Sequence, residues 1–216
     1  MFDEITVIGA GRAGTTIAAR LRERGLRLGE NGDLRLICVP DRAIAEVARA
    51  IEPGPWVAHV SGATPLAALD PHELRFSVHP LQTLSKEGGP TQLDGAWGGV
   101  TAASDEARVR GLWLAETLGL HPFFLADDRR ALYHAGASIA SNFLVTLYRV
   151  AAYLVDRAGA PPEALVPLME RTIVNGFQLT GPIARGDWST VDRHREVLHD
   201  TDYAVLYDAL AEATRP

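Results

Sequence analysis

The strongest constraint on this chain is a glycine-rich turn near its N-terminus. A short apolar segment with Ile5, Val7 and Ile8 leads directly into Gly9-Ala10-Gly11-Arg12-Ala13-Gly14, and a helical pattern follows at once. The spacing G-x-G-x-x-G between a strand and a helix is typical of folds that bind a dinucleotide. The glycines permit the tight turn, the approach of a pyrophosphate and the close packing of helix on strand. A strand-to-helix turn without a ligand is the alternative interpretation.

The segment after this first helix is shorter than a complete dinucleotide-binding fold requires. We expect the helix to end near Arg24-Gly25, and the next strong strand is residues 34–39. A parallel crossover needs about a dozen residues, so a further strand and helix cannot fit between them. Residues 26–28 could form a short strand, which the Asn31-Gly32 pair would turn into an antiparallel hairpin. The pyrophosphate half of a cofactor site is therefore well supported, whereas the adenosine half has only Glu30 at the usual spacing.

Composition narrows the class of protein. The 216 residues suffice for one large domain or two small ones, and 47% hydrophobic with 22% charged residues is ordinary for a soluble globular chain. A net charge of −6 argues against nucleic-acid binding, which needs a basic face. The single cysteine, Cys38, fits a reducing compartment. We find no signal peptide and no apolar run long enough to span a bilayer, so we expect a cytoplasmic protein without a membrane partner.

The pattern of elements changes once along the chain. Strands alternate with helices up to Asp127, which implies a mainly parallel sheet covered on both faces. Beyond it we find no convincing strand: one long helix over residues 129–157 precedes shorter helices around 163–174, 188–198 and 202–213. The predicted fold class is α/β, a truncated Rossmann-like sheet over residues 1–127 followed by a smaller all-helical domain over 128–216.

Six stretches of the sequence carry a family pattern, namely residues 7–14, 38–44, 59–63, 77–81, 133–144 and 179–187. They resemble the Rossmann-like proteins with a C-terminal DUF2520 domain, in the larger group of 6-phosphogluconate dehydrogenases, ketopantoate reductases and pyrroline-5-carboxylate reductases. The resemblance implies an oxidoreductase that uses NADP or NAD to reduce a small carbonyl, imine or hydroxy/keto acid held between the two domains. It also implies a homodimer formed through the helical domain. The segment after Gly25 is shorter than is usual in the family.

Polar residues interrupt the first helix of the second domain. His134, Ser138 and Asn142 follow one another at i, i+4 and i+8, which places them on one face of an α-helix, and Ser141 precedes Asn142. Such a stripe needs polar partners. By the resemblance, His134 would be the general acid, and Asn142 would hold the substrate, with Ser138 beside them. Alternatively, these residues satisfy one another at the interface between the domains.

The remaining candidates lie at strand ends and in one later loop. The predicted cofactor-binding residues are Gly9, Gly11, Arg12, Ala13, Gly14, Pro40, Ser61 and Gly62. The predicted substrate-binding residues are His79, Ser141 and Arg185, since ligands sit at the carboxyl ends of parallel strands and an arginine suits an acidic substrate. Ser61 and His79 could instead serve ordinary loop structure, and Arg185 could pair with Asp187. His194 and His199 lack metal-like spacing, so we predict no metal site.

Two classes of function stay open. The first is the NAD(P)-dependent oxidoreductase, with a small, acidic molecule as substrate. The second is a non-catalytic nucleotide- or metabolite-binding protein with a degenerate dinucleotide site. The sequence does not choose NADP over NAD, because the segment that usually selects between them is absent.

Overall fold

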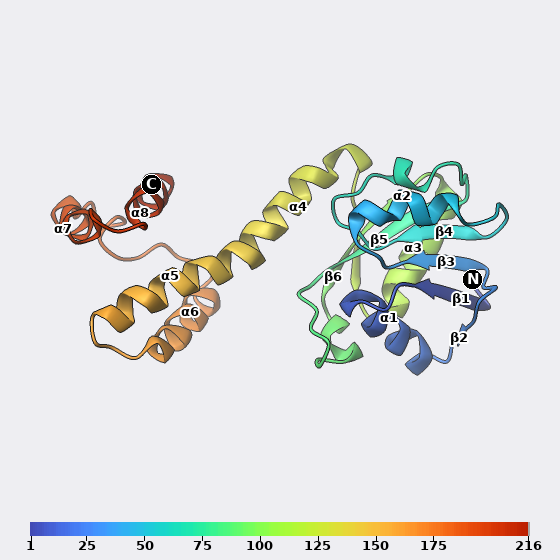
Figure 1. The fold of residues 1–216 in the computed structure, drawn as a ribbon, viewed down its shortest axis with the longest axis horizontal. Helices are drawn as coiled ribbons and strands as arrows, with labels where there is room; N and C mark the ends of the chain where they lie inside the picture. The colour runs from blue at the N-terminus through green and yellow to red at the C-terminus, as the bar shows by residue number, and fades with distance from the viewer. Residues whose placement is uncertain (216) are drawn as a thin grey trace. The chain divides into compact units, whose positions relative to one another are not determined.

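The computed structural model describes residues 1–215, in which seven strands form one sheet (Figure 1). In chain order they are β1 (Glu4–Ile8), β2 (Arg27–Leu28), β3 (Leu34–Ile37), β4 (Trp56–His59), β5 (Arg75–Leu81), β6 (Trp97–Ala102) and β7 (His121–Phe124). Their order across the sheet is β2-β1-β3-β4-β5-β6-β7, and the pairs are parallel except for β5 with β6. The predicted mainly parallel α/β sheet is therefore confirmed.

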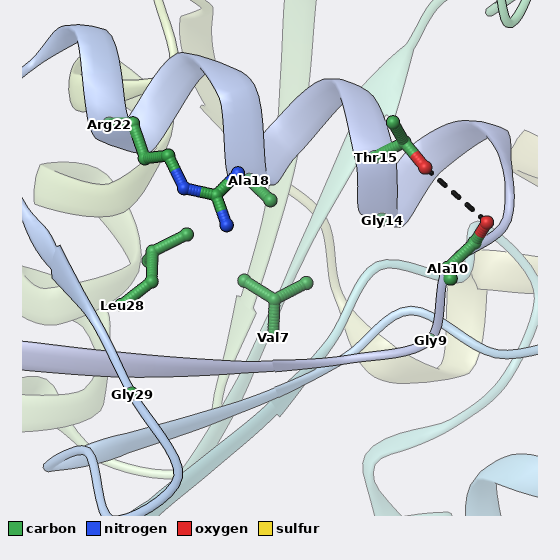
Figure 2. Close-up of a pocket in the computed structure, with 9 residues that line it drawn as sticks. All are labelled: Val7, Gly9, Ala10, Gly14, Thr15, Ala18, Arg22, Leu28 and Gly29. Carbon is green, nitrogen blue, oxygen red and sulfur yellow. Dashed lines mark hydrogen bonds between the residues drawn. The ribbon is translucent and has the colours of Figure 1, made fainter.

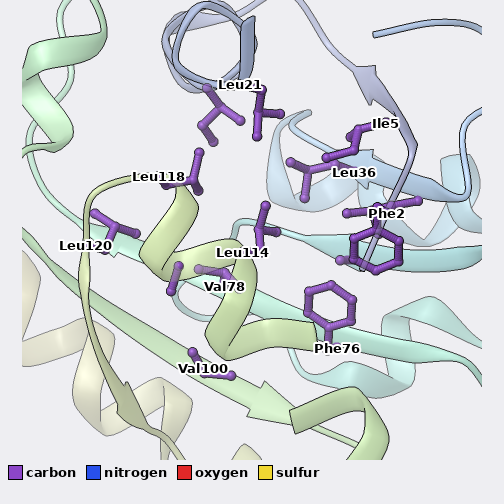
Figure 3. Packing of buried hydrophobic residues seen from close by; sticks show 14 of the residues in the cluster. Phe2, Ile5, Leu21, Leu36, Phe76, Val78, Val100, Leu114, Leu118 and Leu120 are labelled. Atoms are coloured by element: carbon purple, nitrogen blue, oxygen red, sulfur yellow. The ribbon is translucent and has the colours of Figure 1, made fainter. Parts of the chain in front are cut away.

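Helices cover both faces of this sheet. On one face, α1 (Arg12–Glu23) and α3 (Asp105–Thr117) pack Leu21 and Leu114 against strand residues such as Leu36 and Phe76 (Figure 3). On the other face, α2 (Asp41–Arg49) packs Ile44 against Ile37 and Val57. Because side chains alternate along a strand, the two faces form two separate apolar clusters.

The short second strand corrects a prediction. β2 pairs with β1 in the parallel sense, with Arg27 opposite Glu4 and Leu28 opposite Ile5. The expected antiparallel hairpin was wrong because β2 and β3 do not pair with each other; β1 lies between them. Since β2 contains only two residues, the connection 29–33 needs only to cross β1. It does so in close contact, because a Cβ on Gly32 would lie 2.6 Å from the carbonyl oxygen of Glu4.

The rest of the chain is helical. It contains α4 (Arg130–Ser138), α5 (Leu144–Arg157), α6 (Leu165–Val174), α7 (Trp188–Leu198) and α8 (Ala204–Ala213). Between Asp127 and Arg215 the structure has no strand, as predicted. A π-helical turn, Ile139–Phe143, joins α4 to α5. By its internal contacts the chain divides into two compact units after Ser141, so α4 belongs to the unit that contains the sheet.

The continuous helical stretch Asp127–Arg157 departs from the sequence expectation about membranes. Its 31 residues include a window of mean hydropathy 1.3, which is long and apolar enough to cross a bilayer by length and composition. The expectation that no apolar run reaches this length was wrong. One such helix is weak evidence of a membrane span, and none of its apolar window is buried within the structure described.

Candidate functional site

The turn after β1 is built by glycines that have different surroundings. Gly9 has φ +119°, and a Cβ there would lie 2.5 Å from the carbonyl oxygen of Cys38. A Cβ on Gly14 would lie 2.0 Å from the carbonyl oxygen of Gly9. Around Gly11, in contrast, a Cβ would meet nothing within 4 Å. Gly9 and Gly14 therefore serve the packing of the turn, whereas Gly11 faces open space.

Gly11 is also the N-cap residue of α1, and no side chain caps this helix end. The first N–H groups of a helix have no acceptor within it, and the helix dipole favours an anion there. Backbone N–H groups beside an open glycine fit a pyrophosphate. Arg12, the first residue of α1, is exposed next to them, and Ala13 is half-buried.

A pocket of about 390 Å³ lies beside this turn (Figure 2). It extends from the glycines along one side of α1 to the end of β2. The residues that line it are Val7, Gly9, Ala10, Gly14, Thr15, Ala18, Arg22, Leu28 and Gly29. The predicted turn residues Gly9 and Gly14 thus contribute to a real cavity.

Three side chains converge near the carboxyl ends of β4 and β5. His79 on β5 has its Nδ1 2.8 Å from the hydroxyl of Tyr133 on α4. The rings of His79 and His134 lie edge to face with centroids 6.0 Å apart. Gly62 makes room for both rings, since a Cβ there would lie 2.6 Å from Cδ2 of His134 and 2.9 Å from Nε2 of His79. The structure therefore brings together three predicted residues, Gly62, His79 and His134.

Tyr133 belongs to the same group, and sequence reasoning assigned it no role. Burial raises its pKa to about 12, so the phenol keeps its proton at neutral pH. Burial, followed by the charges of His134 and Arg130, lowers the pKa of His79 to about 4, which keeps this imidazole neutral. A protonated phenol bonded to a neutral imidazole can serve as a proton donor or acceptor without a buried charge at rest. In the sequence, the one signal for a role of Tyr133 was its position directly before His134.

Arg130 lies beneath this group and was also missed. It is 1% exposed, and its guanidinium donates to Ser77 Oγ and Thr101 Oγ1, both at 2.7 Å, and to the carbonyl oxygen of Ser61. Ser77 lies in β5, Thr101 lies in β6, and Ser61 lies two residues after the end of β4, so the arginine ties the first turn of α4 to the sheet. Nothing in the sequence distinguishes it from its exposed neighbour Arg129.

Ser61 stabilises the loop that follows β4 through hydrogen bonds of its hydroxyl. Its hydroxyl donates to Asp41 at 2.8 Å and accepts from the backbone N–H groups of Ala63 and Thr64. These contacts support the interpretation as a loop-capping residue, and its role toward a cofactor remains a prediction. Pro40 is the N-cap residue of α2, directly before Asp41.

The other predicted site residues are more scattered. Ser138 ends α4, and Ser141 Oγ donates to the carbonyl oxygen of Ala137 at 2.8 Å. Asn142 lies in the π-helical turn, where i→i+5 hydrogen bonds alter the angular spacing that the i, i+4, i+8 argument assumed. Asn142 and Arg185 are exposed and belong to the second compact unit.

The loop before α7 resolves one open alternative. Asp187 caps α7 by accepting from the N–H of Thr190 at 3.2 Å, and it also accepts from the hydroxyls of Ser189 and Thr190. Among the residues described, no ion pair joins Arg185 to Asp187. Within residues 1–215 no group of three His, Cys, Asp or Glu side chains is arranged to hold a metal ion.

Several solved structures share this fold. BF3122 from Bacteroides fragilis, named provisionally as an NADP oxidoreductase, is 23% identical, with a TM-score of 0.80 over 97% of this chain and 96% of that chain. Protein TM1727 from Thermotoga maritima is 22% identical, with a TM-score of 0.77, and the likeness covers 97% of this chain and 96% of that chain. The 1-pyrroline-5-carboxylate reductase of Streptococcus pyogenes is 13% identical, with a TM-score of 0.64 over 98% and 96%. These likenesses confirm the Rossmann-like fold.

No curated protein sequence matches the chain. The family model described as "Domain of unknown function (DUF2520)" matches residues 96–214, which is more than half of the chain and includes β6, β7 and all of the helices from α3 onward. The resemblance seen in residues 133–144 and 179–187 is thereby confirmed, and the chain belongs to the DUF2520 family.

Proposed function

We propose that this protein is an NAD(P)-dependent oxidoreductase that reduces a small carbonyl, imine or keto acid. The observation that carries the proposal is the turn at Gly9–Gly14, in which Gly11 alone opens onto free space at the uncapped start of α1. This turn follows β1. The group formed by His79, Tyr133 and His134 lies near the carboxyl ends of β4 and β5. These strands have the same direction as β1, because β1 pairs in parallel with β3, β3 with β4, and β4 with β5. Binding and proton-transfer groups therefore share the edge where parallel sheets bind ligands.

The names of proteins with the same fold support the cofactor class. Besides the NADP oxidoreductase and the pyrroline-5-carboxylate reductase, they include an imine reductase from Streptomyces aurantiacus, with 16% identity and a TM-score of 0.70. A bound nicotinamide would supply the hydride for the reduction. The residues of this chain would hold its pyrophosphate on the N–H groups that follow Gly11, with Arg12 beside them.

In this proposal the carbon of the C=O or C=N bond accepts the hydride, the π electron pair of that bond moves onto the oxygen or nitrogen, and His134 protonates this atom. An imidazole can exchange a proton near neutral pH, and His134 is half-buried beside the neutral His79. Tyr133 would orient His79 through the 2.8 Å contact. Asn142, Ser138, Ser141 and Arg185 keep their predicted roles toward an acidic substrate as part of the proposal.

His134 can be tested against a small panel of 2-keto acids and cyclic imines, with NADPH and NADH consumption as the readout. His134→Gln keeps the size and polarity of the side chain but removes the exchangeable proton. We expect a loss of turnover of about 10²-fold or more with little change in cofactor affinity. Equal turnover by wild type and variant would remove His134 from the mechanism.

A nucleotide-binding protein without turnover is the second candidate. The two-residue β2, with no strand beyond it in residues 1–215, favours this function because the adenosine half of a complete site is reduced. Thermal-shift measurements separate the two candidates. Stabilisation by NADPH or NADH supports the oxidoreductase, whereas stabilisation by AMP or ADP but by neither dinucleotide supports the binding protein.

A further inference from the structure

The pocket in Figure 2 exists because β2 is short. β1 pairs with β2 only at Glu4 and Ile5, so on that side no strand continues beside Val7. The space left there is floored by Val7 and Leu28 and walled by Ala18 of α1. It is continuous with the glycine turn, since Gly9 and Gly14 line the same cavity. The shortened strand thus leaves a defined cavity where the adenosine half of a dinucleotide would lie.

Arg22 is the one charged residue among the nine that line this pocket. Its side chain extends from α1 over the pocket, toward Val7 and Leu28 (Figure 2). Among residues 1–215 its guanidinium has no ion pair; the acids near α1 are bonded instead to Arg20, on the far side of the helix. A free guanidinium on an apolar floor is suited to a doubly charged phosphate, which it can bind through two N–H groups.

The end of β2 carries no acid into this pocket. The residue that follows β2 is Gly29; the carboxylate of Glu4 on β1 lies 2.1 Å from the position of a Cβ on it, but Glu4 is not among the residues that line the pocket. Glu30, the acid at the usual sequence spacing, does not line the pocket. Folds that bind NAD use an acid at this place for the ribose hydroxyls, and those that bind NADP accommodate the 2′-phosphate with an arginine.

We propose that Arg22 binds the 2′-phosphate of the cofactor, so that the protein selects NADP(H) over NAD(H). The proposal rests on the proposed function, because it concerns the adenosine end of the same dinucleotide site. It supplies the choice between the two cofactors that the sequence pattern leaves open. No covalent step is involved; the discrimination is a difference in binding affinity.

The experiment compares Arg22→Gln with wild type and with Arg24→Gln. Arg24 follows the end of α1, and its Nη2 lies 3.9 Å from the position of a Cβ on Gly119, away from the pocket. Titrations of NADPH and NADH would be followed by nicotinamide fluorescence. The fragment pair adenosine 2′,5′-bisphosphate and 5′-AMP, which differ only in the 2′-phosphate, would be measured by calorimetry.

We expect wild type and R24Q to bind NADPH about tenfold or more tightly than NADH, because charge-assisted hydrogen bonds are lost with the 2′-phosphate. R22Q should weaken the binding of NADPH and of the bisphosphate by a similar factor, and it should leave the affinities for NADH and AMP nearly unchanged. Circular dichroism checks that R22Q is folded, as expected for an exposed residue. Arg22→Lys keeps the positive charge but loses the planar guanidinium, so its affinity for NADPH should lie between those of wild type and R22Q.

The two proposals fail in different ways. If wild type binds neither dinucleotide, the proposed function fails. If it binds both equally, or if R22Q leaves the preference for NADPH intact, the role of Arg22 is overturned while the dinucleotide site stands. If R24Q removes the preference as fully as R22Q, the selectivity arises from general surface charge, and the assignment to Arg22 is also overturned.

Discussion

At the scale of single residues, the buried Arg130 does the most to place the candidate catalytic group. Its three acceptors, Ser77, Thr101 and the carbonyl of Ser61, fix the first turn of α4, and the next turn presents Tyr133 and His134 to His79. A buried guanidinium is costly to desolvate. The three hydrogen bonds from Nη1 and Nη2 offset part of this cost, while the buried Nε has no partner among the residues described.

Arg130→Met tests this role. The variant leaves the Ser61 carbonyl without a donor and removes two hydrogen bonds to hydroxyls, so we expect a loss of about 2 kcal/mol in the free energy of unfolding. Urea denaturation measures it. Arg129→Met, at the exposed neighbour, is the control and should change stability by less than about 0.5 kcal/mol. Equal stability of R130M and wild type would contradict the role of Arg130 as an anchor.

The buried His59 and His79 should make the free energy of unfolding depend on pH. Burial is the main cause that lowers their pKa values to about 3 and about 4, so both are neutral in the folded state. In the unfolded chain a histidine titrates near pH 6.5. Between pH 6.5 and 4 the unfolded state therefore binds more protons, and stability should fall as the pH falls, by about 1.4 kcal/mol per pH unit for each such histidine.

Urea denaturation at pH 7, 6 and 5 measures this slope. His79→Gln removes one of the two groups and should make the slope about half as steep. A free energy of unfolding that stays constant from pH 7 to pH 5 would show that these imidazoles are not kept neutral by the fold.

At the scale of elements, the crossing of β1 by residues 29–33 helps to shape the pocket proposed for the cofactor, since Gly29 lines it. Gly32 contacts the backbone of β1 directly, and its N–H donates to Thr6 Oγ1 at 3.0 Å. The atoms nearest to a Cβ on Gly32 belong to the backbone of Glu4 and Thr6, which cannot move aside as the end of a flexible side chain can. The short β2 and its connection are therefore one packed unit.

Gly32→Ala should cost about 2 kcal/mol or more, because the methyl group would overlap the backbone of Glu4 and Thr6. Gly136→Ala is the matched control: a Cβ there meets nothing within 4 Å inside α4, so the variant should gain up to about 1 kcal/mol in stability. Thermal and urea denaturation measure both. If the two variants behave alike, the crossing is not packed as described.

The same elements separate what sequence could predict from what it could not. The turn at Gly9–Gly14, the alternation of strands and helices up to Asp127 and the all-helical second half follow from local patterns of apolar and turn residues. The direction of β2 does not, because it depends on pairing with β1 more than twenty residues earlier. The burial of Arg130 and the partner of Tyr133 likewise arise only when three strands and α4 meet.

At the scale of the whole molecule, the helical unit buries very little. From Asn142 to Arg215 the buried residues are Val191, Leu198 and Ala211, and neither α5 nor α6 contains one. Apolar side chains such as Leu168 on α6 are instead exposed. Amphipathic helices are stable when their apolar face is covered. This supports the proposal, first made from the family resemblance, of a homodimer through the helical domain.

Analytical ultracentrifugation tests this state. We expect a dimer at micromolar concentration and its dissociation by Leu168→Glu, because a charge would be buried at the interface. Val109→Glu places the same charge at an exposed apolar residue of α3, in the first unit, and should leave the dimer intact. A wild-type monomer across the whole concentration range would contradict the proposal.

The central claim is that the turn after β1 binds a dinucleotide through Gly11. Nicotinamide fluorescence titration of wild type and Gly11→Val with NADPH tests it most directly, because a side chain at Gly11 fills open space and leaves the packing of the turn unchanged. We predict micromolar binding by wild type and its loss in G11V, with both proteins equally folded. Equal NADPH affinity in wild type and G11V, or no binding by wild type, would contradict the account.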